Sequence, residues 1–269
     1  MHCRGEATVT HAHGGGDHGD RLLLFADMSA TTRARVLGCP VDVVAMDEAV
    51  RRLAEIAGAP PGTPPVLVVT ANPEIIMRAR REAAFKDIIE SAALVVPDGI
   101  GLVRALQRRG HRNAVRVAGA DLLEAYLPAA AQRGQRLALV GAGPGVAEEA
   151  ARRLRNRHPG LDVMADGGDP LPSTARRLAA AAPAVVAAAY GAGAQERFLR
   201  DHLAAIGARA GIGVGGTLDY IAGASRRAPA SVQGAGLEWL WRLVVSPRRW
   251  RRQLVLPIFW WLERREARR

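Results

Sequence analysis

An aspartate after a short apolar run is the residue of this sequence best suited to acid–base chemistry. The apolar run 94–96 leads through one proline into Asp98, and another apolar run, 66–69, leads into Thr70 and Asn72. Read as two buried parallel strands, both runs deliver polar side chains at their carboxyl ends, where open α/β sheets bind ligands. A carboxylate placed there can take a proton from an attacking hydroxyl group. We therefore predict that Asp98 is a catalytic carboxylate.

Glycine-rich loops follow further predicted strands. The first reads GAGPG and lies between a strand and a helix, where glycines let backbone N–H groups approach a phosphate. Val146 stands where a dinucleotide fingerprint has its last glycine. Gly141, Gly143 and Gly145 are thus candidate substrate contacts, and a tight turn without a ligand is the alternative left open.

The second loop, GVGGTLD, contains Gly215, Gly216 and Asp219. The carboxylate of Asp219 can accept hydrogen bonds from a ribose or a base, or it can cap a helix. A third loop precedes Gln195 and Glu196. These two residues are either part of the site or the solvated first turn of a helix. Three such loops at one edge of a sheet favour a shared site.

Arg116 is a candidate phosphate ligand, with one half of a surface ion pair as its alternative. The sequence has no HExxH, CxxC or D-x-D motif and no Ser-His-Asp order. The leader histidines His11, His13 and His18 are explained by composition alone. We therefore predict neither a metal nor a cofactor, and a metal-independent mechanism.

The elements that must position these residues alternate regularly, which favours an α/β fold with a parallel sheet covered by helices on both faces. Strands are predicted at 41–45, 66–69, 94–96, 136–140, 161–165, 184–188 and 211–214. Helices are predicted at 47–57, 73–90, 100–108, 122–132, 146–157, 173–181 and 195–203.

The chain has 269 residues and is 49% apolar, enough to bury a full core. We predict a disordered leader (1–36), an α/β core (37–236) and a helical appendage (237–269). Because one of the two cysteines, Cys3, lies in the leader, a structural disulfide with Cys39 is not expected. No apolar run approaches the roughly 18 residues of a spanning helix. The leader lacks a signal-peptide pattern, so we expect a cytoplasmic protein.

The last 31 residues differ from the rest in composition. They hold all five tryptophans and nine arginines against two glutamates, a formal charge of +7 out of the chain's +11. Pro247 and Pro257 are expected to divide this tail into about three short helices. Tryptophan and leucine interleaved with arginine are typical of helices lying in a membrane interface. A basic helical hairpin packed on the core is the alternative.

Seven segments together resemble one known family, the WecG/TagA/CpsF glycosyltransferases, which make bacterial surface polysaccharides and wall teichoic acid. The segments are TANPE (70–74), VPDGIGLV (96–103), RVAGADLL (116–123), LVGAGPGVAEEA (139–150), GAGAQERFL (191–199), GVGGTLDYIAGASRRAP (213–229) and GLEWLWRLVVSPRRWRRQL (236–254).

The resemblance implies a Rossmann-like fold of the GT-E type with a C-terminal helical appendage. It also implies inverting, metal-independent transfer of an N-acetylhexosamine-type sugar, such as ManNAc. The donor would be a UDP-sugar and the acceptor a sugar on a polyprenyl diphosphate. The family's appendage closes over the site and meets the membrane, so we expect a peripheral protein on the inner face of the cell membrane.

The resemblance also implies roles for single residues of the core. Asp98 would be the general base, and Thr70 and Asn72 would line the pocket for sugar and base. Arg116 would meet the substrate's diphosphate or sugar. Gln195 would help to position the acceptor or the donor.

Outside these positions, Asp219 would lie beside the nucleotide, and Arg242, Arg249 and Arg252 of the tail would reach the pyrophosphate. The chain departs from the family at residues 193–194, where Gly-Ala replaces the usual Pro-Lys. No nucleic-acid partner is predicted, and a homo-oligomer is left open. The alternative functions are a nucleotide-dependent oxidoreductase and a non-catalytic membrane-surface module.

Overall fold

The computed structural model describes residues 32–60, 62–234, 237–245 and 254–268. Its strands are β1 Arg33–Val36, β2 Cys39–Asp42, β3 Val66–Ala71, β4 Leu94–Pro97, β5 Leu137–Gly141, β6 Val163–Asp166, β7 Val185–Ala189 and β8 Ala210–Gly213. Its helices are α2 Met46–Ala57, α3 Pro73–Arg81, α4 Ala83–Glu90, α5 Ile100–Arg108, α6 Gly119–Gln132, α7 Val146–Arg157, α8 Pro172–Ala181, α9 Ala194–Ile206, α10 Thr217–Ala222, α11 Ala230–Gly234, α12 Glu238–Val245 and α14 Val255–Glu266.

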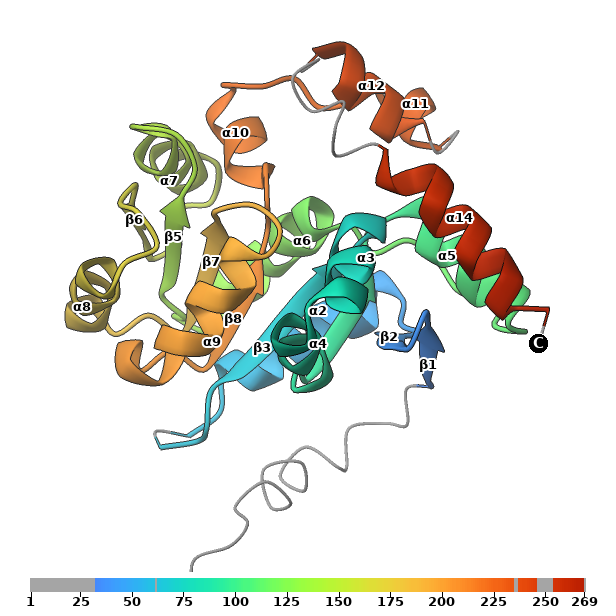
Figure 1. The fold of residues 1–269 in the computed structure, drawn as a ribbon. Helices are drawn as coiled ribbons and strands as arrows, with labels where there is room; N and C mark the ends of the chain where they lie inside the picture. The colour runs from blue at the N-terminus through green and yellow to red at the C-terminus, as the bar shows by residue number, and fades with distance from the viewer. Residues whose placement is uncertain (1–31, 61, 235–236, 246–253, 269) are drawn as a thin grey trace, which may run out of the picture. The chain divides into compact units, whose positions relative to one another are not determined.

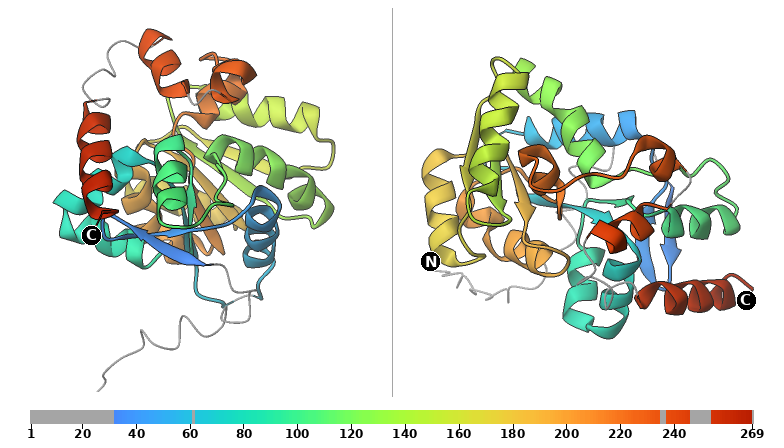
Figure 2. Two further views of the ribbon diagram at one scale, coloured as in Figure 1. Left: turned by 90° about the vertical axis from the view of Figure 1, so that its right-hand side faces the viewer. Right: turned by 90° about the horizontal axis from the view of Figure 1, so that it is seen from above.

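Six strands form one parallel sheet in the order β4-β3-β8-β7-β5-β6 (Figure 1). The helices α3, α4, α8 and α9 cover one face and α2, α6 and α7 the other (Figure 2). Both faces of the sheet are therefore buried, which explains why the strands read as continuous apolar runs rather than alternating ones. The predicted α/β class with a doubly covered parallel sheet is confirmed.

Several predicted boundaries are wrong, among them that of the strand expected at 41–45, which is β2 at Cys39–Asp42. The strand β1 begins at Arg33, inside the leader expected at 1–36, and pairs antiparallel with β2. Residues 1–31 lie outside the described part of the chain. The helix expected over 73–90 is two helices, because Glu82 has an extended backbone (φ −123°, ψ 102°) between α3 and α4. The break lets the ring of Phe85 turn fully into the core.

The expected helix break at Pro257 is also absent. Pro257 lies in the first turn of α14, where the backbone N–H groups have no partner within the helix in any case. A proline there costs the helix no hydrogen bond, so α14 starts before it rather than after it.

The helix α14 packs on α3 and α5 of the α/β unit (Figure 1). Phe259 is fully buried in this contact, and so is the carboxylate of Glu263. Glu263 pairs with Arg108 and, at 2.6 Å, with Arg109, both at the end of α5. A buried carboxylate needs such partners, because its desolvation is otherwise costly. The C-terminal helix is therefore an integral part of the packed unit.

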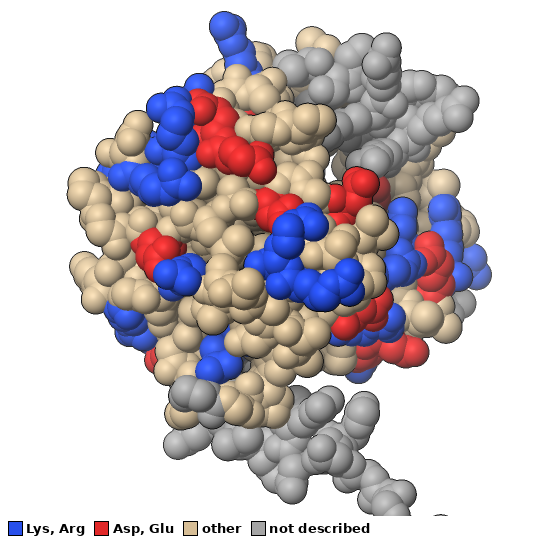
Figure 3. Space-filling view, turned by 90° about the vertical axis from the view of Figure 1, so that its left-hand side faces the viewer, with Lys and Arg blue, Asp and Glu red and all other residues tan. Residues whose placement is uncertain are grey.

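No helix of the described residues is both long enough and apolar enough to cross a bilayer. On the face that carries α7 and α8, arginines lie next to acidic side chains (Figure 3). The pairs Arg152–Glu149 and Arg177–Asp166 are examples, at 2.7 and 2.6 Å. The charges on this face are thus mixed in sign.

Candidate active site

Asp98 lies where the sequence places it, directly after β4. Its backbone N–H donates to the carbonyl of Ala71 on the neighbouring strand β3, at 2.8 Å. The β3–β4 register pairs Ala71 with Pro97, so the ends of both strands lie at one edge of the sheet. The Asp98 side chain is 22% exposed. A partly buried carboxylate fixed at a strand end can act on a bound substrate.

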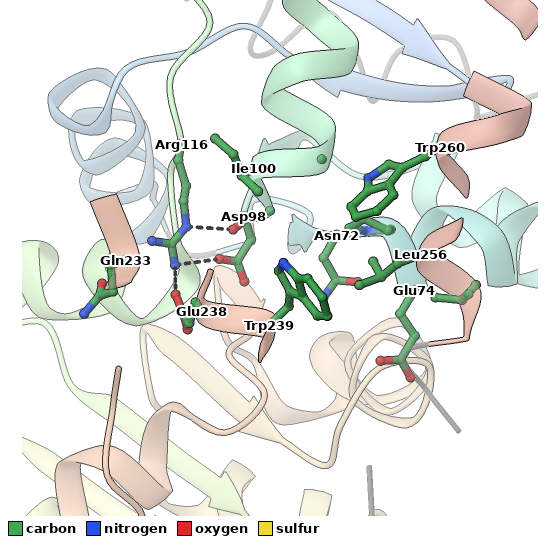
Figure 4. Close-up of a pocket in the computed structure, with 14 residues that line it drawn as sticks. Asn72, Glu74, Asp98, Ile100, Arg116, Gln233, Glu238, Trp239, Leu256 and Trp260 are labelled. Atoms are coloured by element: carbon green, nitrogen blue, oxygen red, sulfur yellow. Dashed lines mark hydrogen bonds and ion pairs between the residues drawn. The ribbon is translucent and has the colours of Figure 1, made fainter. Parts of the chain in front are cut away.

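Arg116 reaches Asp98 from the loop between α5 and α6. The N–H of Val117 donates to Pro97 O at 3.0 Å, which fixes this loop beside the end of β4. Arg116 Nε then donates to the Asp98 carbonyl at 3.0 Å, and its Nη2 lies 3.8 Å from the Asp98 carboxylate (Figure 4). The structure thus pairs Arg116 with Asp98, a contact that the sequence analysis did not predict, and Arg116 stays a candidate phosphate ligand.

Thr70 and Asn72 also lie beside Asp98, but both side chains have structural contacts. The Thr70 hydroxyl is buried and donates to Gly213 O at 2.7 Å, which ties β3 to β8. Asn72 is the N-cap of α3, and its Oδ1 accepts from the N–H of Ile75 at 3.0 Å. Each keeps hydrogen-bonding capacity, since a hydroxyl also accepts and an amide also donates.

Gln195 and Glu196 are both buried, so the alternative of a solvated first helical turn is wrong for this pair. Gln195 donates to Glu196 at 2.8 Å and accepts from the N–H of Gly215 at 3.1 Å. Glu196 in turn accepts from the N–H of Gly193 at 2.6 Å. Burial raises the pKa of the Glu196 carboxyl. This network holds the loop at Gly215 in place.

Two glycines make the network possible. Gly193 has a φ of +91°, and a Cβ there would lie 2.3 Å from the guanidinium of Arg78. A Cβ on Gly213 would lie 2.4 Å from the Gln195 amide. The family that the sequence resembles usually has proline at this position. Glycine at 193 lets Arg78 approach the backbone closely.

Two connected cavities meet at Asp98. The first is polar and lies over the ends of β3, β7 and β8; its lining includes Gln195, Tyr220 and Arg227. The second, of about 160 Å³, is partly apolar and is lined by Trp239 and Trp260 (Figure 4). The residues that line both are Asn72, Glu74, Asp98, Arg116 and Glu238. The carboxylate at Asp98 can therefore contact the contents of either cavity.

Residues 34–269 match the model of the glycosyl transferase WecG/TagA/CpsF family. The chain belongs to this family. It is 34% identical over 193 residues to an N-acetylglucosaminyldiphosphoundecaprenol N-acetyl-beta-D-mannosaminyltransferase of Bacillus spizizenii, covering 71% of this chain and 75% of that protein. A protein of the same name from Bacillus subtilis is 30% identical over 194 residues, with 71% and 76% covered.

Membership of the WecG/TagA/CpsF family confirms the resemblance inferred from the seven segments. It decides against an oxidoreductase and against a non-catalytic membrane module, since the family consists of glycosyl transferases. Among the described residues, no group of three or more His, Cys, Asp or Glu side chains is arranged to hold a metal ion.

Not every predicted substrate contact of this glycosyl transferase lies at the Asp98 cavities. The loop with Gly141, Gly143 and Gly145 follows β5, which is three strands from β3, roughly 14 Å away. Gly141 instead packs against the ring of Tyr190. Gly215 and Gly216 line the polar cavity. The strand order, which the sequence did not predict, decides which glycine loop lies near Asp98.

Asp219 lies in the first turn of α10, with its carboxylate near Gly216. It is not part of the lining of the polar cavity, although its neighbours Thr217 and Tyr220 are. Arg242 belongs to α12. Arg249 and Arg252 lie outside the described residues, so their predicted contacts with a pyrophosphate stay predictions.

The structure adds site residues that the sequence reading missed. Glu238, at the start of α12, accepts from Arg116 Nη2 at 2.6 Å. Trp239 and Trp260 come from two different helices of the tail and pack edge to face at 6.4 Å. Their clustering in the last 31 residues was visible, but the prediction assigned them to the membrane and not to the Asp98 cavity.

Proposed function

We propose that the protein transfers a ManNAc-like N-acetylhexosamine from a UDP-sugar to a sugar on a polyprenyl diphosphate, with inversion. The observation that carries this proposal is the place of Asp98 at the junction of a polar and a partly apolar cavity. The printed names of the two Bacillus relatives support the sugar and the lipid-linked acceptor.

Asp98 acts as the general base in this reaction. The acceptor hydroxyl oxygen bonds to the anomeric carbon, its proton passes to the Asp98 carboxylate, and the bond between that carbon and the UDP oxygen breaks. Attack from the side opposite to UDP inverts the anomeric centre. A single positioned base is sufficient for such a step. The Nη2 of Arg116 lies 3.8 Å from the carboxylate and pairs with it electrostatically.

The UDP leaving group gains negative charge as the bond breaks, and arginines together with backbone N–H groups stabilise it without a metal. Arg116 supplies one such cation in the described part of the site. Gly215 and Gly216 line the same polar cavity. Arg242, Arg249 and Arg252 of the tail add further cations in this proposal.

The tail also brings the site to the membrane surface. Leu237, just before α12, and Leu240 and Val244 within it are exposed, and α14 exposes Ile258 and Trp261. Apolar side chains at such spacing on a basic segment enter a lipid interface. Because Trp239 and Trp260 of the same helices line the partly apolar cavity, we assign this cavity to the lipid-linked acceptor and the polar one to the UDP-sugar.

The test is to incubate the full chain with a panel of UDP-sugars and a lipid-linked GlcNAc analogue, with and without EDTA, and to read the product mass. We expect a mass increase of one N-acetylhexosamine with one donor, unchanged by EDTA. If no donor in the panel gives a product with an added hexosamine, the proposed reaction is refuted. Loss of product in EDTA would refute metal independence alone.

A further inference from the structure

Arg227 is the second arginine of the polar cavity, and the function assigned above leaves it without a role. It lies in the segment between α10 and α11, within the motif GASRRAP. It lines the polar cavity together with Arg116. It also lines an adjoining groove between α6, α7 and α10, which shares Ala120, Thr217 and Tyr220 with that cavity. Arg227 therefore lies at the border between the polar cavity and this groove.

The hydrogen bonds of Arg227 are incomplete. Its two Nη groups donate to the Asp121 carboxylate at 2.6 and 2.8 Å. Its Nε–H is buried and has no hydrogen-bond partner among the described residues. Buried donors in native proteins are rarely left unpaired, and each such group calls for an explanation. The Arg227 side chain lines the cavity, and a planar guanidinium is suited to bind a phosphate through two of its N–H groups.

A carboxylate from the tail already lies in this region. Glu238 accepts from Arg116 at 2.6 Å and is 13% exposed (Figure 4). The pKa of Arg227 is raised, chiefly by its hydrogen bonds to Asp121 and further by the charges of Asp121 and Glu238. Glu238 is thus near both arginines of the polar cavity, in the kind of position that an anionic ligand would take between them.

We propose that Arg227 and Arg116 together bind a diphosphate group in the polar cavity, and that Glu238 takes the place of this group in the ligand-free chain. This inference rests on the proposed function, which assigns the polar cavity to the UDP-sugar, and the test below distinguishes that source from a polyprenyl diphosphate. Arg227 can turn from Asp121 to the ligand at little cost, because the Asp121 side chain is 42% exposed and its charge is then solvated by water.

The test measures binding of inorganic pyrophosphate, UDP and geranyl diphosphate to the full chain by calorimetry. Arg227→Gln removes a charged donor and is expected to weaken pyrophosphate binding roughly 10- to 100-fold. Arg226→Gln is the matched control, because it removes the same charge from an exposed neighbouring residue that does not line the cavity. It is expected to change binding less than about twofold. Glu238→Gln is expected to tighten binding, because it removes the competing carboxylate.

Asp121→Asn distinguishes a ligand-binding role of Arg227 from a purely structural one. It keeps Arg227 and frees its guanidinium, so pyrophosphate binding stays equal or tightens. Equal weakening by Asp121→Asn and Arg227→Gln, with a lowered melting temperature in both, would mean that the Arg227–Asp121 pair only supports the fold, and would overturn the proposal. Unchanged binding of all three probes by Arg227→Gln, or no binding by the unaltered chain, would overturn it as well.

The two other probes identify the source of the group. Weaker UDP binding alone assigns Arg227 to the donor, and weaker geranyl diphosphate binding alone assigns it to the acceptor. Sugar transfer is read separately as product mass. Transfer by the unaltered chain with no effect of Arg227→Gln on binding refutes only this inference. Binding that depends on Arg227 without any transfer refutes only the proposed reaction.

Discussion

The replacement Glu263→Ala is expected to release α14 from the α/β unit. The Glu263 carboxylate is fully buried and pairs with Arg108 and Arg109, which are 35% and 15% exposed. Removing one partner of a buried ion pair costs roughly 3–5 kcal/mol. Since the arginines left behind can be partly hydrated, we take the lower end, about 3 kcal/mol. The population of chains with α14 detached then rises roughly 150-fold.

Hydrogen exchange read by mass spectrometry measures this change directly. The amides of residues 259–266 are expected to lose about 3 kcal/mol of opening free energy in Glu263→Ala. Arg264→Ala is the control on the same helix, because that charged side chain is exposed. Its loss is expected to stay near 1 kcal/mol or less. Equal protection of α14 in both variants would refute the anchoring role of Glu263.

Three further outcomes are expected. Replacing Ile258 and Trp261, 44% and 59% exposed, by Ser lowers affinity for anionic vesicles at least roughly tenfold in a sedimentation assay, and unchanged affinity would refute membrane contact through α14. Gly213→Ala, whose Cβ would lie 2.4 Å from the Gln195 amide, lowers the free energy of unfolding by about 1–3 kcal/mol in urea, and full stability would contradict the packed network. Burial raises the pKa of the Cys39 thiol to about 11, so with the leader cysteine replaced by Ser, the native chain resists alkylation at pH 8 and reacts only when unfolded.

The sheet and the central carboxylate were predictable because their signals are local. An apolar run that ends in polar residues marks a buried parallel strand, and this placed Asp98, Thr70 and Asn72 at one edge. Arg116 followed from the family motif, and its loop is held there by a backbone hydrogen bond from Val117.

The rest of the site depends on contacts between residues far apart in the chain. Glu238 pairs with Arg116 across 122 residues, and nothing near Glu238 in the sequence indicates that partner. Gly141 was assigned to the substrate by its loop type, but the strand order places it away from Asp98. The buried Glu196 had the sequence context of an exposed first helical turn and is enclosed only by the folded loops around it.

The rate of sugar transfer by Asp98→Asn tests the central claim most directly. The amide keeps the size of the side chain but cannot accept the acceptor's proton, so the rate is expected to fall roughly 10²- to 10⁴-fold. Affinity for UDP, measured on the same preparation, is expected to stay within about threefold. Transfer by Asp98→Asn at more than a tenth of the unaltered rate would contradict the assignment of Asp98 as the general base.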